Sequence, residues 1–189
     1  YDLGGVKVGP GTSSMQIAPE WRGAAPPDGN IPVVDARGSD IAPVDLTKEA
    51  EALRLKSYVW PEMTGRIARI DTAIAMAKRM PPELERADAG DWVDQVLAEP
   101  QQEGTTRVLF HTIMWQYLPD FTQTRITNSM HAAGEKADAD RPLAWLSLET
   151  NRETFTHELY ARYWPGGPEP VHLANAHAHG EWVEWLGAD

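Results

Sequence analysis

The chain has 189 residues, with 17 Lys or Arg against 28 Asp or Glu, and its formal net charge of −11 opposes binding to the phosphates of nucleic acids. Hydrophobic residues make up 42% and charged residues 24%, which is typical of a folded, soluble domain. The absence of cysteine excludes disulfides, thiolate metal sites and cysteine nucleophiles.

No apolar run approaches the roughly 18 residues that a membrane span needs, and the N-terminus lacks the pattern of a signal peptide. We therefore predict a cytoplasmic protein with no membrane partner and no nucleic-acid partner. Nothing in the sequence indicates an oligomeric state.

Residues 1–30 are rich in glycine and proline, which predicts turns and short strands without a helix. Within them, residues 6–8 and 15–17 are expected to pair as a hairpin. Because the opening YDLGGVKVG is typical of the middle of a hairpin, we expect a further segment upstream. We predict that 1–30 is an irregular N-terminal segment and that 31–189 is an α/β domain.

The first half of this domain is expected to alternate strands and helices. IPVVDA at 31–36 predicts a strand, and Asp45 or Thr47 is expected to cap the helix that follows. From Pro61 apolar residues recur at steps of three and four, which predicts a second helix up to the next proline pair. Residues 84–92 predict a short strand, an acidic turn and the start of a helix.

The alternation continues toward the C-terminus. We predict strands at 107–111 and 143–149 and, between them, a helix at 120–133 with Phe121 and Met130 turned inward. Two or three extended segments follow. This order predicts a Rossmann-like α/β fold, with a mostly parallel sheet, helices on both faces and an antiparallel, β-rich C-terminal edge.

Ligands of such sheets bind beyond the carboxyl ends of the strands, so polar residues at these ends are candidates for a site. Asp40 could accept hydrogen bonds from ribose hydroxyls, or it could form an Asx turn. Asp88 could accept from an adenine amino group, with Trp92 as an apolar lid, or it could cap the next helix. Glu149 ends the strand predicted at 143–149.

His111 lies where a predicted strand gives way to the apolar run IMWQYL. One interpretation is a core histidine that donates to a backbone carbonyl. The other places the ring in the cleft, where Trp115 and Tyr117 form the wall of a pocket.

A cluster of histidines near the C-terminus has a spacing that metals use in proteins. It consists of His172, His177 and His179, with Glu181 and Glu184 close by in sequence. Because the sequence fixes no complete ligand set, our first prediction is that no metal is bound. Fingerprints of triad hydrolases, phosphate-binding loops and dinucleotide-binding loops are missing from the sequence.

Several blocks of the sequence together resemble a bacterial family known as domain of unknown function 2332. They are EWRGAAPP, RGSDIAPVDL, LKSYVWPE, ADAGDW, FHTIMWQYL, LSLE, YWPGG and HLANAHAHGEWVEWL, and they cover nearly the whole chain. The order of elements in that family is similar to that of S-adenosylmethionine-dependent methyltransferases. The resemblance implies a methyltransferase-like domain, of which this chain is the C-terminal portion without the first strand and its glycine-rich cofactor loop.

On this resemblance, Asp40 meets the ribose of S-adenosylmethionine, and Asp88, beside Trp92, meets its adenine. His111, Tyr117 and Glu149 line the site of a small acceptor molecule, with His111 as the base. The resemblance does not name the acceptor.

Two other functions fit the sequence. A domain of this fold without the glycine-rich loop could be a non-catalytic binding or scaffold module, whose surface tryptophans meet a partner. The cluster of His172, His177 and His179 could instead serve a metal-dependent hydrolase.

Overall fold

A computed structural model describes residues 1–26, 29 and 31–187 of the chain. The chain divides into two compact units: unit 1 comprises Tyr1–Val8, Ile17–Gly29 and Gly90–Asp189, and unit 2 comprises Gly9–Gln16 and Asn30–Ala89. Residues 27, 28, 30, 188 and 189, which include the ends of both predicted domains, lie outside the described residues. The predicted division of the chain at residue 30 stays a prediction.

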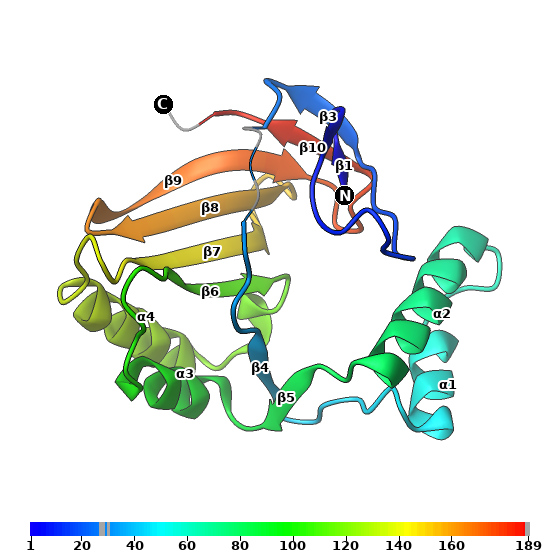
Figure 1. Ribbon diagram of the computed structural model, residues 1–189, viewed down its shortest axis with the longest axis horizontal. Coiled ribbons are helices and arrows are strands. Elements are labelled where there is room, and N and C mark those ends of the chain that lie inside the picture. The colour runs from blue at the N-terminus through cyan, green and yellow to red at the C-terminus, as the bar shows by residue number, and fades with distance from the viewer. Residues whose placement is uncertain (27–28, 30, 188–189) are drawn as a thin grey trace. The chain divides into compact units, whose positions relative to one another are not determined.

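Unit 1 is built on a six-stranded sheet in the order β3-β10-β9-β8-β7-β6 (Figure 1). Its strands are β3 (Glu20–Gly23), β6 (Arg107–Thr112), β7 (Leu143–Thr150), β8 (His157–Trp164), β9 (Gly167–Ala176) and β10 (Trp182–Trp185). The helical elements of this unit are α3 (Ala89–Ala98), the short 3-10 turn η1 (Trp115–Tyr117) and α4 (Asp120–Gly134).

The sheet is largely antiparallel, so the predicted mostly parallel, Rossmann-like sheet is not confirmed. β8 pairs antiparallel with β7 and β9, and β9 pairs antiparallel with β10, whereas only the β6–β7 and β3–β10 pairs are parallel. Parallel neighbours need a long crossover, and among the strands that are adjacent both in this sheet and in the order of its strands along the chain, only β6 and β7 are joined by a helix. Short turns reverse the chain between β7, β8 and β9, and the predicted antiparallel C-terminal strands are confirmed.

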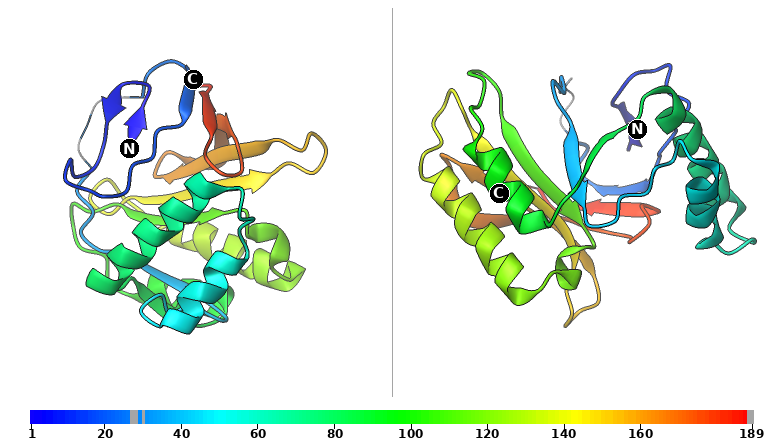
Figure 2. Two further views of the ribbon diagram at one scale, coloured as in Figure 1. Left: turned by 90° about the vertical axis from the view of Figure 1, so that its right-hand side faces the viewer. Right: turned by 90° about the horizontal axis from the view of Figure 1, so that it is seen from below.

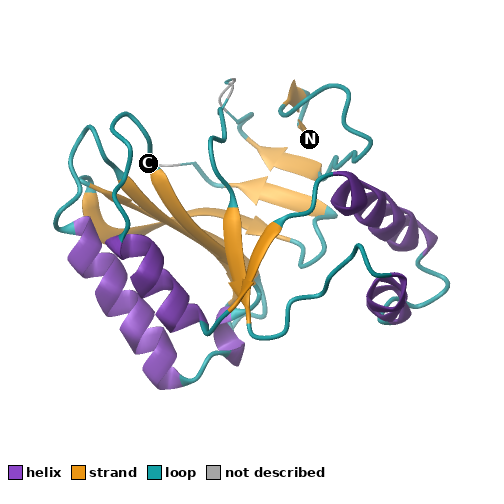
Figure 3. Ribbon diagram, turned by 60° about the horizontal axis from the view of Figure 1, so that its bottom comes forward, coloured by secondary structure: helices purple, strands orange, loops and turns teal. Residues whose placement is uncertain are grey.

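Both helices of unit 1 lie on the same face of the sheet, not on opposite faces as predicted (Figures 2 and 3). α4 forms the crossover between β6 and β7, and α3 precedes β6 in the chain. Ile126 and Met130 of α4 are buried as the helical pattern requires. Phe121 is 73% exposed, so its predicted inward orientation is wrong. Asp120 in the first turn of α4 places a negative charge at the positive end of the helix dipole.

The N-terminal hairpin of unit 1 is tighter than predicted. β2 (Val6–Lys7) pairs with β1 (Asp2–Leu3) and not with residues 15–17. The reason is that Gly4 and Gly5 both have positive φ values, 65° and 97°, and form a two-residue turn between the strands.

Unit 2 holds a two-stranded parallel sheet, with two helices between its strands in sequence. The elements are β4 (Arg37–Asp40), α1 (Glu49–Ser57), α2 (Thr64–Arg79) and β5 (Glu83–Arg86). The strand predicted at 31–36 is wrong: Ile31, Val33 and Val34 are at least 75% exposed, and these β-branched side chains pack against no core. The helices predicted after Thr47 and after Pro61 are confirmed, although the second begins only at Thr64. The predicted cap of the first helix is wrong, because the N-cap residue of α1 is Lys48 and no side chain caps it.

None of the described helices is long and apolar enough to cross a membrane.

Gly134 allows the end of α4 to approach the sheet closely. A Cβ atom built on Gly134 would lie 2.5 Å from Cδ2 of Trp164, a ring that is buried. We expect Gly134→Ala to lower the free energy of unfolding by about 1–3 kcal/mol, as overpacking does, in urea denaturation.

The matched control is Gly65→Ala in α2, where a Cβ meets nothing within 4 Å. This substitution should be neutral or should stabilise the protein by up to about 1 kcal/mol. Equal effects of the two substitutions would contradict the proposed packing of α4 on Trp164.

Candidate functional site

A pocket of about 340 Å³ lies in unit 1, on the face of the sheet that α4 covers. It is lined by His111, Trp115, Thr127, Trp145, Ser147, Glu149, Tyr160, Arg162 and Pro170. The strand register explains why these residues meet. His111 on β6 and Tyr160 on β8 both pair with Ser147 on β7. Since residues two apart along a strand share a face, Trp145 and Glu149 join Ser147 on the pocket side.

Glu149 accepts three hydrogen bonds on one carboxylate oxygen. Its Oε1 atom lies 2.7 Å from Nδ1 of His111 and accepts the backbone N–H groups of Met114 at 3.1 Å and Trp115 at 3.2 Å. Among the residues that the structure describes, none donates to Oε2. The carboxylate therefore fixes the turn after β6 with one oxygen and keeps the other available to a ligand.

The turn that Glu149 holds has a strained backbone. Ile113, the first residue after β6, has a φ of 48°, in the left-handed region that a β-branched residue rarely adopts. Such a conformation costs about 1–3 kcal/mol and persists only where the surroundings fix it. Here the N–H of Ile113 donates to Leu148 O at 2.8 Å, and the next two amides donate to Glu149.

The same hydrogen bonds set the ionisation of Glu149. Burial raises the pKa of this carboxyl, but the hydrogen bonds from His111 and from the amides of Met114 and Trp115 together lower the pKa by more. The pKa therefore lies below the ordinary value of a glutamate. At neutral pH Glu149 is an ionised group that accepts hydrogen bonds and attracts positive charge.

His111 uses both of its ring nitrogens within the protein. The indole N–H of Trp145 lies 3.0 Å from Nε2, and an indole N–H can only donate, so Nε2 must carry the lone pair. The proton of the neutral ring is then on Nδ1, where it donates to Glu149. The ring also stacks on Trp115 with 4.9 Å between centroids. Because the lone pair on Nε2 of His111 already accepts the hydrogen bond from Trp145, His111 has no acceptor for a ligand. Oε2 of Glu149 is an acceptor that a ligand in the pocket can use.

Arg162 and Tyr160 form the β8 wall of the pocket. The Arg162 guanidinium lies 4.9 Å from the centroid of the Trp145 ring, and its Nη1 lies 3.2 Å from Nε2 of His131 on α4. Tyr160 donates to Glu158 at 3.2 Å. Burial raises the pKa of Tyr160, and the Glu158 carboxylate raises it further, so the hydroxyl keeps its proton.

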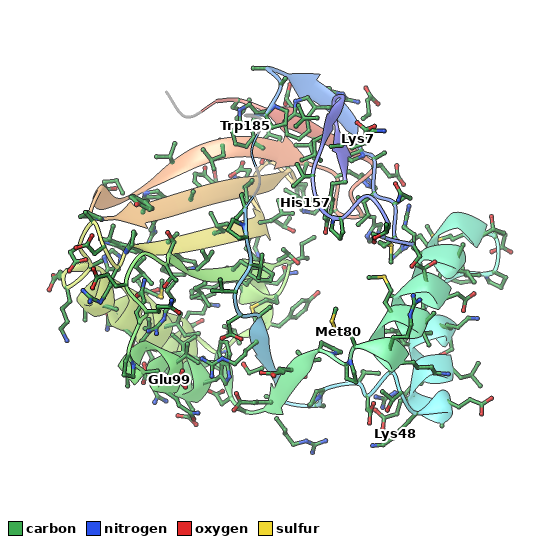
Figure 4. The ribbon with its side chains drawn as sticks, viewed as in Figure 1. Lys7, Lys48, Met80, Glu99, His157 and Trp185 are labelled. Carbon is green, nitrogen blue, oxygen red and sulfur yellow. The ribbon has the colours of Figure 1, made fainter. Side chains whose placement is uncertain are left out.

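The ends of the strands next to Glu149 are tied together. Thr150 Oγ1 and His157 Nδ1 are 3.0 Å apart, and the two residues pair where β7 ends and β8 begins. Figure 4 labels His157. Asn151 in the following turn donates to Glu158 at 2.9 Å. These contacts hold the β7–β8 turn beside the site.

Of the acceptor-site residues predicted from sequence, the structure brings His111 and Glu149 together. Tyr117 is 76% exposed and does not line the pocket, whereas its neighbour Trp115 does. Sequence reasoning missed Trp145 and the β8 residues of the pocket. The alternation of side chains within 143–149 places Trp145 on the face of Glu149, and this signal was available in the sequence.

The predicted cofactor residues belong to other parts of the chain. Asp40 and Asp88 lie in unit 2, where Asp40 pairs with Arg86 in the β4–β5 sheet. Oδ1 of Asp40 accepts the N–H of Ala42 at 2.7 Å, which is the Asx turn of the alternative interpretation. Trp92 lies in α3 of unit 1. Contacts of these three predicted residues with ribose and adenine stay predictions.

The C-terminal histidines do not form a ligand set for a metal. Nε2 of His172 lies 3.1 Å from Oδ1 of Asn175 and 3.2 Å from the carbonyl oxygen of Ala174, and its ring stacks on Tyr160. Within residues 1–26, 29 and 31–187, no group of three or more His, Asp or Glu side chains is placed to hold a metal ion.

The fold and the site define a mixed α/β protein with an aromatic-lined, polar pocket next to the ends of two parallel strands, β6 and β7. Residues 1–185 match the family described as "Uncharacterized protein conserved in bacteria (DUF2332)", and the chain belongs to this family. The family resemblance predicted from the sequence blocks is thereby confirmed. No curated protein and no solved structure matches the chain.

The hydrogen bond from Trp145 predicts the tautomer of His111. At neutral pH, long-range ¹H–¹⁵N spectra of the imidazole should show a protonated Nδ1 and an unprotonated Nε2. In Trp145→Phe, Nε2 loses its donor and its ¹⁵N resonance should shift, whereas Trp182→Phe, which is outside the pocket, should leave the His111 signals unchanged. A protonated Nε2 in the unsubstituted protein would refute this hydrogen-bond assignment.

Proposed function

We propose that unit 1 binds a small organic molecule in the Glu149 pocket and that the protein transfers a methyl group to it. The observation that carries this proposal is the ionised Glu149 carboxylate, with one oxygen fixed by three donors and the other oxygen available to a ligand. A site of this kind, with convergent polar groups between aromatic walls, is typical of small-molecule binding.

Glu149 would position the acceptor. Methyl transfer to oxygen or nitrogen requires that the lone pair of the acceptor be aligned and that its proton be removed. Oε2 accepts a hydrogen bond from the O–H or N–H of the acceptor and takes the proton as the new bond forms. His111 and the amides of Met114 and Trp115 keep the carboxylate in place during this step, because they hold Oε1.

S-adenosylmethionine would supply the methyl group, as the family resemblance implies. The support for its binding by this chain is a pair of acidic residues: Asp40 is the last residue of β4, and Asp88 comes shortly after β5, the parallel neighbour of β4. Carboxylates in such positions accept hydrogen bonds from nucleoside hydroxyl and amino groups. Oδ1 of Asp40 is already bonded to Ala42, so Oδ2 is the oxygen that would meet the ribose.

A second candidate function is a binding module without catalysis. The lowered pKa of Glu149 favours it, since a carboxylate with a low pKa is a weak base at neutral pH. In this case the pocket binds its ligand by the same contacts, and no methyl group is transferred.

Calorimetric titration of S-adenosylmethionine tests the methyl-transfer proposal. We expect saturable heat, a loss of affinity of about tenfold or more in Asp40→Asn because a hydrogen bond to a charged group is removed, and no change in Glu149→Gln. The exposed Glu153→Gln serves as the control for a change of charge alone.

Absence of heat at millimolar ligand, with a native circular dichroism spectrum, would contradict methyl transfer and favour the binding module. Equal binding by the unsubstituted protein and Asp40→Asn would contradict the role of Asp40 in the cofactor site.

A further inference from the structure

Arg162 is a half-buried cation in the pocket that forms no ion pair with a carboxylate among the described residues. Its guanidinium donates to His131 Nε2 at 3.2 Å and lies over the Trp145 ring. A guanidinium has several further N–H groups in a planar fork, and these have no partner in the described part of the chain.

Acidic residues outnumber basic ones by 28 to 17 in this chain, yet none of the described carboxylates pairs with Arg162. On the same face of the sheet, the more exposed Arg125 of α4 binds two carboxylates, those of Asp91 and Asp94. A cation that is withdrawn from water without a counter-charge is unfavourable. A ligand that brings the missing negative charge would offset this cost.

Arg162 and Glu149 lie at different positions along the strands that line the pocket. Arg162 pairs with Trp145, and Glu149 lies four residues farther along β7. The aromatic rings of Trp115 and Trp145 lie 5.5 Å apart between centroids and contribute to the lining. The pocket therefore offers a positive fork, flat apolar surfaces and a carboxylate acceptor to a single molecule.

We propose that Arg162 binds an oxyanion, either a carboxylate or a phosphate group, of a molecule whose hydroxyl or amino group reaches Glu149. This inference rests on the proposed binding of a small molecule in the pocket and adds the chemical class of that molecule. The planar fork suits both oxyanions, because each can accept two parallel N–H bonds. The part of the ligand between its two polar ends is flat and apolar.

Three probes of one shape test the class of ligand. 4-Hydroxybenzoate and 4-hydroxyphenyl phosphate carry the oxyanion opposite a hydroxyl, and 4-hydroxybenzamide replaces it with a neutral group. Binding is followed by the indole N–H signals of Trp115 and Trp145 in ¹H–¹⁵N spectra, assigned with Trp→Phe variants. We expect at least one of the two anions to bind at least about tenfold more tightly than the amide. The tighter anion identifies a carboxylate or a phosphate as the preferred group.

Arg162→Gln should abolish the preference for the anion, and Arg162→Lys, which keeps the charge without the fork, should retain part of it. Arg162→Lys also covers the case in which Arg162→Gln fails to fold. The matched control is Arg141→Gln, because Arg141 is exposed and paired with Glu103 at 3.1 Å. This control should bind all three probes like the unsubstituted protein.

The outcomes separate this inference from the function on which it rests. Equal affinities for the anions and the amide would overturn the role of Arg162 and leave small-molecule binding in the pocket standing. No shift of either indole signal with any probe at millimolar concentration would overturn both proposals. Anion binding that survives in Arg162→Gln would place the oxyanion elsewhere in the protein and also overturn this inference.

Discussion

The site depends on one carboxylate oxygen, Oε1 of Glu149. This atom accepts hydrogen bonds from Nδ1–H of His111 and from the backbone N–H groups of Met114 and Trp115. These donors come from the end of β6 and from the turn after it, so a single side chain of β7 organises the neighbouring strand. The left-handed backbone of Ile113 requires such support. Without the carboxylate, two amides and an imidazole would lose their partner in a half-buried environment.

The fixed carboxylate decides what the pocket can recognise. The lowered pKa keeps Glu149 negative at neutral pH, and the indole N–H of Trp145 donates to Nε2 of His111. Arg162 supplies positive charge farther along the lining. A site with opposite charges separated by aromatic rings selects ligands by orientation as well as by shape. This is the physical basis for a small molecule that has one anionic end and one donor end.

Local patterns in the sequence identify most of the elements that carry the site. The sequence predicts the helix at 120–133 that contains Met130, and the β-branched and apolar runs predict strands around His111 and Glu149. His111 has one feature of each interpretation: its side chain is only 10% exposed, and it also lines the pocket. Its partners are the side chains of Glu149 and Trp145 and not the backbone carbonyl that the core interpretation expected. The histidine is therefore a satisfied, buried residue whose hydrogen bonds shape the site.

The pairing of strands could not be read from the sequence. Alternation of strands and helices predicts a parallel sheet, but β4 and β5 pair only with each other among the described strands, and three of the strand pairs in the larger sheet are antiparallel. Arg162 reaches the pocket only because the register of β8 places it opposite Trp145. Register depends on the turn after β7 and on cross-strand packing, which a local pattern does not contain. The exposure of Tyr117 could not be predicted from a local pattern either. The 3-10 turn places Trp115 in the pocket and leaves Tyr117 exposed.

Amide hydrogen exchange of Met114 and Trp115 tests most directly whether Glu149 holds the turn after β6. In the unsubstituted protein both amides should be protected, and in Glu149→Ala they should exchange at least about tenfold faster, since each loses a hydrogen bond to a charged acceptor. The ladder amides of β6 and β7 should keep their protection in both proteins. Unchanged exchange of Met114 and Trp115 in Glu149→Ala would contradict the account.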